Sequence, residues 1–529
     1  MVGSDNRTPS PPLRLVELLA SVSLATDLGT GQPLGHAPRT CTIATAIAEA
    51  MGCGADEVRT VHQFALLRFL GCTSDSAETA AMVGGDDIGF LAAMAPVFMG
   101  SGREMMGRFV RRVGAGQPRM RRLLLVARGL ADPKGGERSL STHCEVAAML
   151  AGRAGLEPSV VDALAHAYER WGGKGYPAGL EGDEIPLAVR VVAVARDADL
   201  ATMLGDDPGE WMSERTGRAY DPSVVQAFER VGPDVLFDLD EADEWETALA
   251  AEPEPVTTVG PDTLDGVLTA FADFADLKSP WIRGHSRRVA SLAEEAGRHA
   301  GLDDAACEDL RRAGLVHDLG RVAIENGIWD KPGPLTTPER ERVRLHAYFT
   351  ERILAPCRPL ASPVKPASSH HERADGSGYH RSLRAEALSP SDRIMAAADV
   401  FAALTADRPH RSAFTEDDAA RMLEANTASS LDADAVTCVL AAGGQRAAPS
   451  SPRWPADLTD REVEVLRLIA RGRSNRDVAE RLYISAKDGR APRREPVHED
   501  RGLLARSRRR LRHGAQAPRL RICSGSPAS

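Results

Sequence analysis

Seven imidazole and carboxylate side chains in the second half of the chain could together bind metal ions. They are His285, His317, Asp318, His346, His370, His371 and Asp399. Nitrogen and oxygen ligands of this kind suit Mn, Fe or Zn, whereas a structural zinc site would use thiolates. A single histidine is more often an ordinary core or surface residue, but burying this many unpartnered polar groups would cost about 2–7 kcal/mol each. The set therefore predicts a shared metal centre.

The residues around these candidate ligands show the apolar spacing of helices. His285 begins HSRRVASLAEEA, and Asp399 lies within DRIMAAADVFAALT; in both segments apolar residues recur at helical intervals. The apolar run AGLV precedes His317 and Asp318, and Gly320 soon after favours a helix end there. We therefore expect helices to present the ligands, and the neighbouring His317 and Asp318 can reach one ion.

The composition indicates a mainly α protein of several domains. A chain of 529 residues is too long for one core, and 5% aromatic residues favour helices over sheets. The net charge of -10 argues against a protein that coats nucleic acid. Eight scattered cysteines without a CxxC pair suit a reducing compartment, so we expect a cytoplasmic protein. The apolar segment LVELLASVSL is too short to span a membrane, so no membrane contact is expected.

An internal repeat organises the first 445 residues. Asp27, His36 and Gly71 recur 249 residues later as Asp276, His285 and Gly320. Further along, a second set recurs at an interval of 203 residues. This set pairs His143, Glu169, Gly175 and Arg190 with His346, Glu372, Gly378 and Arg393. The first copy therefore carries an insertion of 46 residues between Phe69 and His143, and we expect two copies of one helical domain.

The first copy has lost the residues that could bind metal. The counterparts of five candidate ligands are Arg68, Phe69, Ala167, Tyr168 and Arg196. A cation or an apolar group does not coordinate a divalent ion, so His36 and His143 are interpreted as structural residues. A slip in register that used His166 and Asp197 would restore only part of a site. The first copy is then either a nucleotide-binding regulatory domain or a structural partner of the second.

The expected domains follow from the repeat and from breaks rich in Pro, Gly and acidic residues. We expect a degenerate first copy at 10–205, a linker at 206–260 and the metal-binding second copy at 261–445. The segment GGQRAAPSSPRWPAD leads to a different module at 456–487, followed by a disordered basic tail at 488–529.

The motifs HDLGRVAI and HHERADGSGYH resemble the HD-GYP family of the HD phosphohydrolase superfamily. The resemblance implies that the seven candidate ligands hold two or three metal ions and that the substrate is cyclic di-GMP. Neighbouring divalent ions can activate water and neutralise charge on a phosphodiester. Arg321 stands where the family has Lys, His380 follows the GY pair in place of Pro, and Trp281 replaces a Glu of members with three ions. We therefore expect two ions, of Fe, Mn or Zn.

Four residues are candidates for contact with the substrate. They are Arg321, Gly376, Gly378 and Tyr379. Arg321 retains a positive charge for a phosphate group, and with Asp318 it is a candidate catalytic residue. The glycines permit close approach of the backbone to a ligand, and Tyr379 offers a ring or hydroxyl. Alternatively, the GSGY segment only closes a turn.

The segment LTDREVEVLRLIARGRSNRDVAERLYIS (458–485) resembles a LuxR-type helix-turn-helix. Thr459 and Glu462 form a capping-box pattern, and Gly472 marks a turn between two apolar helical runs. Candidate DNA contacts are Ser474, Asn475 and Arg476. A generic helical hairpin is the alternative.

The expected recognition helix is missing after Lys487, where the chain is rich in Arg and Pro. Codons permitted for DGRAPRREPVHEDRG, read one base later, can spell TVGRHVENLYTKIGV, which restores that helix; we hypothesise a frame change. Sequence-specific DNA binding is not expected of the present tail, although its arginines could attract phosphates nonspecifically. Resequencing that finds no extra base near the codon for Asp488 would refute the frame change.

The resemblance and the residues together predict a metal-dependent phosphohydrolase that cleaves a cyclic dinucleotide and is linked to a DNA-binding module. The main alternative is a transcription regulator whose HD domains sense a ligand without turnover. A phosphatase acting on mononucleotides is a third possibility. The expected partners are a nucleotide substrate and DNA, and a homodimer is compatible with the sequence.

Overall fold

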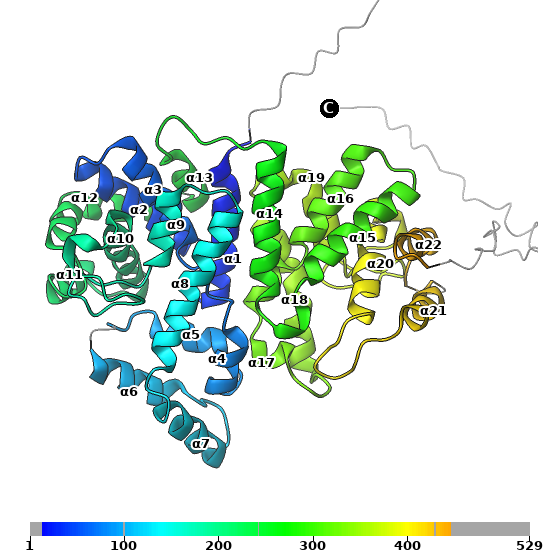
Figure 1. The fold of residues 1–529 in the computed structure, drawn as a ribbon, viewed down its shortest axis with the longest axis horizontal. Helices are drawn as coiled ribbons and strands as arrows, with labels where there is room; N and C mark the ends of the chain where they lie inside the picture. Colours follow the sequence, from blue (N-terminus) through cyan, green and yellow to red (C-terminus); the bar gives the residue numbers. More distant parts are fainter. Residues whose placement is uncertain (1–12, 99–100, 242, 428–429, 446–529) are drawn as a thin grey trace, which may run out of the picture. The chain divides into compact units, whose positions relative to one another are not determined.

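The computed structural model describes residues 13–98, 101–241, 243–427 and 430–445, and these are mainly helical (Figure 1). Within them the backbone forms isolated β-bridges but no longer strand. The expected mainly α fold is thereby confirmed. The chain divides into two units, Met1–Arg446 and Ala447–Ser529, and the described residues belong to the first. None of the described helices is both long enough and apolar enough to cross a membrane.

The two copies follow one another along the first unit. The helices of the first copy and its connection are α1 (Leu15–Thr30), α2 (His36–Ala50), α3 (Ala55–Leu67), α4 (Ser76–Val83), α5 (Asp87–Met94), α6 (Gly102–Arg112), α7 (Arg119–Leu130), α8 (Gly135–Arg153), α9 (Pro158–Ala165), η1 (Gly182–Glu184), α10 (Leu187–Leu204), α11 (Pro208–Arg215), α12 (Pro222–Glu241) and α13 (Glu244–Ala250). Those of the second copy are α14 (Pro261–Asp276), η2 (Pro280–Ile282), α15 (His285–His299), α16 (Asp304–Val316), η3 (Leu319–Ala323), α17 (Asn326–Trp329), α18 (Thr337–Leu354), η4 (Arg358–Leu360), α19 (Ala361–Ser368), η5 (Ala385–Ala387), α20 (Pro390–Leu404), α21 (Glu416–Asn426) and α22 (Ala433–Ala442).

Corresponding helices of the two copies begin and end at equivalent residues. Helices α2 and α15 both start at a histidine that follows a glycine with a positive φ. Helices α3 and α16 each span 13 residues and end just before the HD pair or its counterpart. Helices α9 and α19 each span 8 residues. The copies therefore share one backbone plan, as the repeat predicts.

Two equivalent glycines allow helices to approach closely in each copy. A methyl group added at Gly71 would overlap the carbonyl oxygen of His143, and one at Gly320 would overlap that of His346. Only a residue without Cβ permits such contact between backbones. The turn after α3 or α16 is thereby pressed against α8 or α18, which carries the next histidine.

The inserted residues of the first copy form helices α4 to α7, where the second copy has the short helix α17. Helices α4 and α17 pack against each other across the two copies. The backbone N–H of Gly327 donates to the carbonyl oxygen of Gly85 over 3.0 Å. The insertion therefore contributes to the contact between the copies.

The segment 206–260 differs from the linker that we expected. It contains α11, α12 and α13, and Val224, Phe228 and Leu249 on these helices are buried. Helices α12 and α13 pack against α2 of the first copy. The expectation weighed only the Pro-rich and acidic ends of the segment, which flank a central stretch with apolar helical spacing. The limits of the domains themselves stay a prediction.

Helix α1 of the first copy lies against the second copy. It packs against η3, the turn that follows the HD pair, and against α18. Ser21 Oγ donates to the carbonyl oxygen of Ile353 over 2.9 Å. Arg358 Nη2 donates to Glu17 Oε1 over 2.8 Å. The first copy thus supports the turn on which part of the candidate site is built.

A buried ion pair also joins the copies. Lys278 Nζ lies 2.7 Å from Asp87 Oδ2, and these side chains are 1% and 0% exposed. The other oxygen of Asp87 accepts a hydrogen bond from the backbone N–H of Asn326 over 2.7 Å. Because neither charge reaches water, each is stable only beside the other.

Replacing Lys278→Met should lower the free energy of unfolding by about 3–5 kcal/mol, because Asp87 would remain buried without its cation. Chemical denaturation of the wild type, Lys278→Met and the double variant Lys278→Met/Asp87→Asn measures this. The double variant should recover most of the loss, since the amide still accepts the hydrogen bond from Asn326 without carrying a charge. Equal stability of Lys278→Met and the wild type would contradict the interpretation.

Candidate metal centre

The seven predicted ligands come together in the second copy from separate helical elements. His285 begins α15, His317 and Asp318 lie between α16 and η3, His346 is on α18, His370 and His371 follow α19, and Asp399 is on α20. Six of these side chains are buried, and His371 is partly exposed. The structure thus brings together residues that lie far apart along the chain.

The carboxylate of Asp318 lies between two pairs of histidines. Its Oδ2 is 3.9 Å from His285 Nε2 and 3.5 Å from His317 Nε2. Its Oδ1 is 3.5 Å from His346 Nε2 and 3.7 Å from His370 Nε2. Each oxygen therefore faces a different pair of ring nitrogens, which is the arrangement of a carboxylate that bridges two ions.

Asp399 adds a second carboxylate to the candidate ligands. Its Oδ1 is 3.1 Å from His285 Nε2 and 3.8 Å from His317 Nε2. Its Oδ2 is 3.8 Å from His371 Nδ1. Three overlapping sets of ligand atoms each lie within 4.8 Å of one another. These sets are His285, His317 and Asp399; His317, Asp318 and His370; and His346, His370 and His371.

Hydrogen bonds to the backbone orient three of the imidazole rings. The Nδ1 atoms of His317, His346 and His370 lie 2.8, 2.5 and 2.6 Å from the carbonyl oxygen three residues earlier. A carbonyl oxygen only accepts, so each Nδ1 donates and each Nε2 is left to face the centre. The helix ends that hold these residues thus fix the ring orientations.

The pKa values of the ligands favour binding of cations at neutral pH. Burial would raise the pKa of Asp318, but Arg321 and neighbouring imidazoles hold it well below its ordinary value. The pKa of Asp399 is likewise well below its ordinary value, against the effect of burial. Burial lowers the pKa of His370 to about 3. Burial also opposes protonation of His317, but the two carboxylates raise its pKa to about 9, so a cation bound there would displace a proton.

Two ligand atoms at the centre have no hydrogen-bond partner although they are buried. These atoms are His317 Nε2 and Asp318 Oδ2. A buried polar atom without a partner is costly, and a cation between the two would satisfy both. The imidazole and carboxylate donors present therefore fit divalent metal ions.

Arg321 stands beside the centre with free hydrogen-bond donors. Its Nη1 is 3.2 Å from Asp318 Oδ2, yet Nε and Nη1 make no hydrogen bond. The guanidinium lies 4.0 Å from the ring centroid of Trp329, and Trp329 Nε1 donates to the carbonyl oxygen of Arg321 over 3.2 Å. A planar cation held by an aromatic ring in this way is suited to bind phosphate oxygens.

The GSGY segment forms a tight loop next to the histidines. Gly376 has a φ of 81°, and a Cβ on Gly378 would lie 2.6 Å from the Cα of Glu372. The glycines thus serve close contact within the chain itself. Tyr379 stacks on His371 with the ring centroids 4.3 Å apart. Contact of these residues with a substrate stays a prediction.

Thr350 and Arg408 border the site and were missed by the sequence analysis. Thr350 Oγ1 donates to the carbonyl oxygen of His317 over 2.8 Å. Thr350 lies one helical turn after His346, and this spacing could have predicted that it lies on the same face of the helix, beside the site. Burial, and next Arg321, lower the pKa of Arg408 to about 10. No local pattern marks Arg408 or Trp329, because only the folded chain brings them to Arg321.

The first copy holds other residues at the equivalent positions. Within the described residues, all candidate metal groups lie in the second copy. His36 Nδ1 is 2.7 Å from Asp199 Oδ2, and His143 Nε2 is 2.7 Å from Asp75 Oδ1. Each histidine is thus engaged by one carboxylate, in keeping with a structural role.

A slip in register does not restore a metal site in the first copy. His166 Nδ1 bonds to the carbonyl oxygen of Asp162 over 2.9 Å on its own helix turn. Asp197 forms ion pairs with Arg196 and Arg215. Within the described residues, no hydrogen bond or ion pair joins either residue to His36 or His143, and neither belongs to a candidate metal group.

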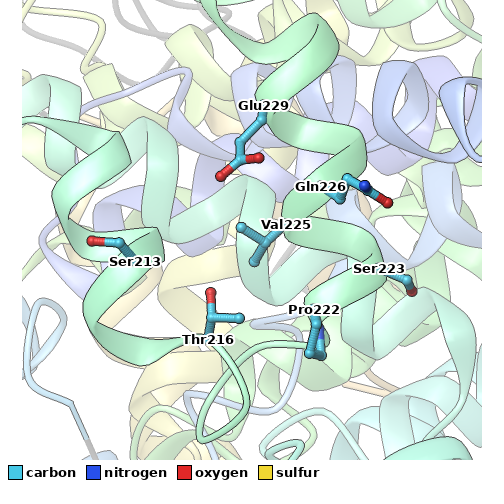
Figure 2. A pocket seen from close by; sticks show the side chains of 7 residues that line it. All are labelled: Ser213, Thr216, Pro222, Ser223, Val225, Gln226 and Glu229. Carbon is cyan, nitrogen blue, oxygen red and sulfur yellow. The ribbon is translucent and has the colours of Figure 1, made fainter.

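An open pocket of about 670 Å³ lies elsewhere, between α11 and α12 (Figure 2). It is lined by Ser213, Thr216, Pro222, Ser223, Val225, Gln226 and Glu229. Its single carboxylate and few hydroxyl groups offer no set of metal ligands, and none of its lining residues belongs to the histidine cluster. It is therefore not part of the candidate centre.

Comparison with protein families finds the HD domain at residues 136–222 and 269–435, one match in each copy of the repeat. A second family, bacterial regulatory proteins of the luxR family, matches residues 456–488. The predicted DNA contacts Ser474, Asn475 and Arg476 fall in this match and lie outside the described residues.

Three known proteins show how far the similarity extends. A 3'3'-cGAMP-specific phosphodiesterase of Vibrio cholerae is 31% identical over 79% of this chain and 92% of its own length. A cyclic di-GMP phosphodiesterase of Pseudomonas aeruginosa is 37% identical over 26% of this chain and 34% of its own. A solved structure of a cyclic GMP-AMP specific phosphodiesterase of V. cholerae matches with a TM-score of 0.58 and 27% identity, over 82% of this chain and 98% of that one.

The first of these relatives spans both copies of the repeat, so the similarity concerns the tandem arrangement as well as the histidine cluster. This chain therefore belongs to the HD-GYP family of HD-domain phosphodiesterases.

Proposed function

We propose that the second copy hydrolyses a phosphodiester bond of a cyclic dinucleotide with two divalent metal ions. The position of Asp318 carries this proposal, because its two oxygens face two separate groups of imidazoles at 3.5–3.9 Å. A single-ion site would need only one such group. The named activities of the relatives support a cyclic dinucleotide as the class of substrate.

Each residue of the proposed site has a distinct role. Two bound divalent ions would supply an activated water and neutralise charge on the phosphodiester. Asp318 would bridge them, while Asp399 and the five histidines hold them apart from solvent. Arg321 would bind a non-bridging phosphate oxygen through its free donors. Tyr379 would keep His371 in place and offer its ring edge to a base. The ligand set suits Fe, Mn or Zn.

A sensor without turnover is the less favoured function for the second copy. A binding site alone does not need the complete set of seven ligands or the orphaned atoms His317 Nε2 and Asp318 Oδ2. The luxR-family match supports a link between turnover and DNA binding. Ser474, Asn475 and Arg476 stay candidate DNA contacts in that link.

The base identity of the substrate distinguishes the relatives. The relative that spans the tandem repeat is named for 3'3'-cGAMP, and the shorter match is named for cyclic di-GMP. Measuring the rates at which the full chain hydrolyses 3'3'-cGAMP, cyclic di-GMP and a mononucleotide identifies its class of substrate. Cleavage of the mononucleotide alone would replace the proposal by a phosphatase.

Replacing Asp318→Asn should abolish hydrolysis and reduce bound metal, because a neutral amide does not bridge two cations as a carboxylate does. Metal content by elemental analysis and cyclic dinucleotide turnover measure this together. Asp417→Asn, at an exposed carboxylate of α21, is the matched control and should retain both. Full turnover by Asp318→Asn would refute the site.

Replacing Arg321→Met should lower kcat/KM about 10²-fold with metal content unchanged, because a cation aimed at the phosphate is removed. Arg321→Lys should fall between this variant and the wild type, since a point charge replaces the planar fork. Steady-state kinetics with metal analysis tests both variants. Loss of metal from Arg321→Met would instead assign Arg321 to support of the ligands.

A further inference from the structure

The first copy holds four buried arginines around the place that corresponds to the metal centre. Arg68 and Arg196 stand at the positions equivalent to His317 and Asp399. Arg215 pairs with Asp197, and Arg170 lies close to Asp197 and Arg196. We call these four residues the arginine cluster; their exposed fractions are 3% for Arg68, 7% for Arg170, 8% for Arg196 and 9% for Arg215.

The positive charge of the arginine cluster exceeds the negative charge beside it. Within the described part of the chain, the ion pairs of the cluster all go to Asp197, which pairs with Arg196 and, at 3.7 Å, with Arg215. Asp197 Oδ2 also accepts a hydrogen bond from Tyr220 Oη over 2.6 Å. Among the residues that the structure describes, Arg170 Nη1 donates only to the carbonyl oxygen of Glu169, over 3.2 Å. Two of the four guanidinium groups therefore share one carboxylate, and Arg68 and Arg170 form no ion pair within the described residues.

Arg68 is the least satisfied member of the arginine cluster. Its Nε and Nη1 are buried and have no hydrogen-bond partner. Its guanidinium carbon lies 5.5 Å from the ring centroid of Phe69 and 5.7 Å from that of Tyr168, so it lies beside two aromatic rings. Burial, Arg196 and Arg170 lower the pKa of Arg68 to about 9, which leaves it charged at neutral pH. A buried charge with free donors is costly unless an anion meets it.

Replacement of a metal ion by arginine charge does not account for the arginine cluster. In the second copy, the carboxylates of Asp318 and Asp399 would balance the positive charge of bound metal ions. The first copy has Phe69 and Arg196 at those positions, so the carboxylates that a cation would neutralise are gone as well. The change of residues has therefore inverted the preference of the site, from cations to anions.

We propose that the arginine cluster of the first copy binds a phosphate group, either as inorganic phosphate or as the terminal phosphate of a nucleotide. Guanidinium groups present paired N–H donors that match phosphate oxygens. The tight burial of the four side chains favours a small anion over a whole cyclic dinucleotide. The side chains of Arg196 and Arg215 are 9% and 10% exposed, so the cluster reaches solvent on their side. This binding is independent of hydrolysis in the second copy.

Titration of inorganic phosphate into the chelator-treated full chain tests the proposal, with calorimetry and thermal melting at constant ionic strength. Phosphate should bind to the wild type and raise its melting temperature. Arg68→Met should weaken binding about tenfold or more, because charge-assisted hydrogen bonds are lost. Without phosphate, Arg68→Met should melt at the same or a higher temperature, since an unpaired buried charge has been removed.

Arg128→Met, at an exposed arginine of α7, is the matched control, because it removes a cation of the first copy outside the arginine cluster and should leave this phosphate binding intact. Arg196→Gln provides the same comparison as Arg68→Met if the latter does not fold. Comparing the affinity of the chain for a linear dinucleotide with a terminal phosphate and for inorganic phosphate shows which of these two ligands the arginine cluster binds more tightly. Absence of phosphate binding to the wild type, or equal binding to Arg68→Met, would overturn the proposal.

Discussion

The second copy depends on the interaction of the Asp318 carboxylate with the imidazoles on both sides of it. Two carboxylates and five imidazoles are held together with almost no access to water. Hydrogen bonds from Nδ1 to backbone carbonyls turn three of the rings so that their Nε2 atoms converge on the carboxylates. The helices thus impose a geometry that is unfavourable unless cations occupy the space between the ligands. Both the buried location of the site and its chemistry follow from this constraint.

The fold that holds the ligands does not itself depend on metal. In the first copy Gly71 makes the same close contact with the next helix as Gly320 does in the second, although the ligands around it are gone. The loop after the HH position is likewise held by a buried glutamate in each copy. Glu169 accepts backbone hydrogen bonds from Ala178, Gly179 and Leu180, and Glu372 accepts them from Arg381 and Leu383. A retained loop without metal ligands therefore has a structural explanation.

The sequence predicts the helical class and the repeat, because both depend on residue types at regular intervals. The convergence of the seven ligands is predicted from the number of imidazoles and carboxylates and from the resemblance to the HD-GYP family. The constant intervals between Asp27 and Asp276 and between His143 and His346 describe equivalent backbone positions, and the structure confirms this. The linker prediction for 206–260 erred because composition at the ends of a segment does not reveal helices in its middle. The stacking of Arg321 on Trp329 could not be foreseen, since it depends on how the turn at η3 packs against its neighbours.

The packing of α1 against η3 explains how the two copies can diverge in chemistry while remaining one structural unit. The turn at η3 is only five residues long and carries Arg321, so its position is set largely by the helices around it. One of those helices belongs to the first copy, and Ser21 and Glu17 tie it to the second. The first copy must therefore keep its packing surface, whereas its interior ligand positions are free to change. Its residues show this division: Gly71 and Glu169 keep their places, while five of the seven positions that hold proposed metal ligands in the second copy have changed, to Arg68, Phe69, Ala167, Tyr168 and Arg196.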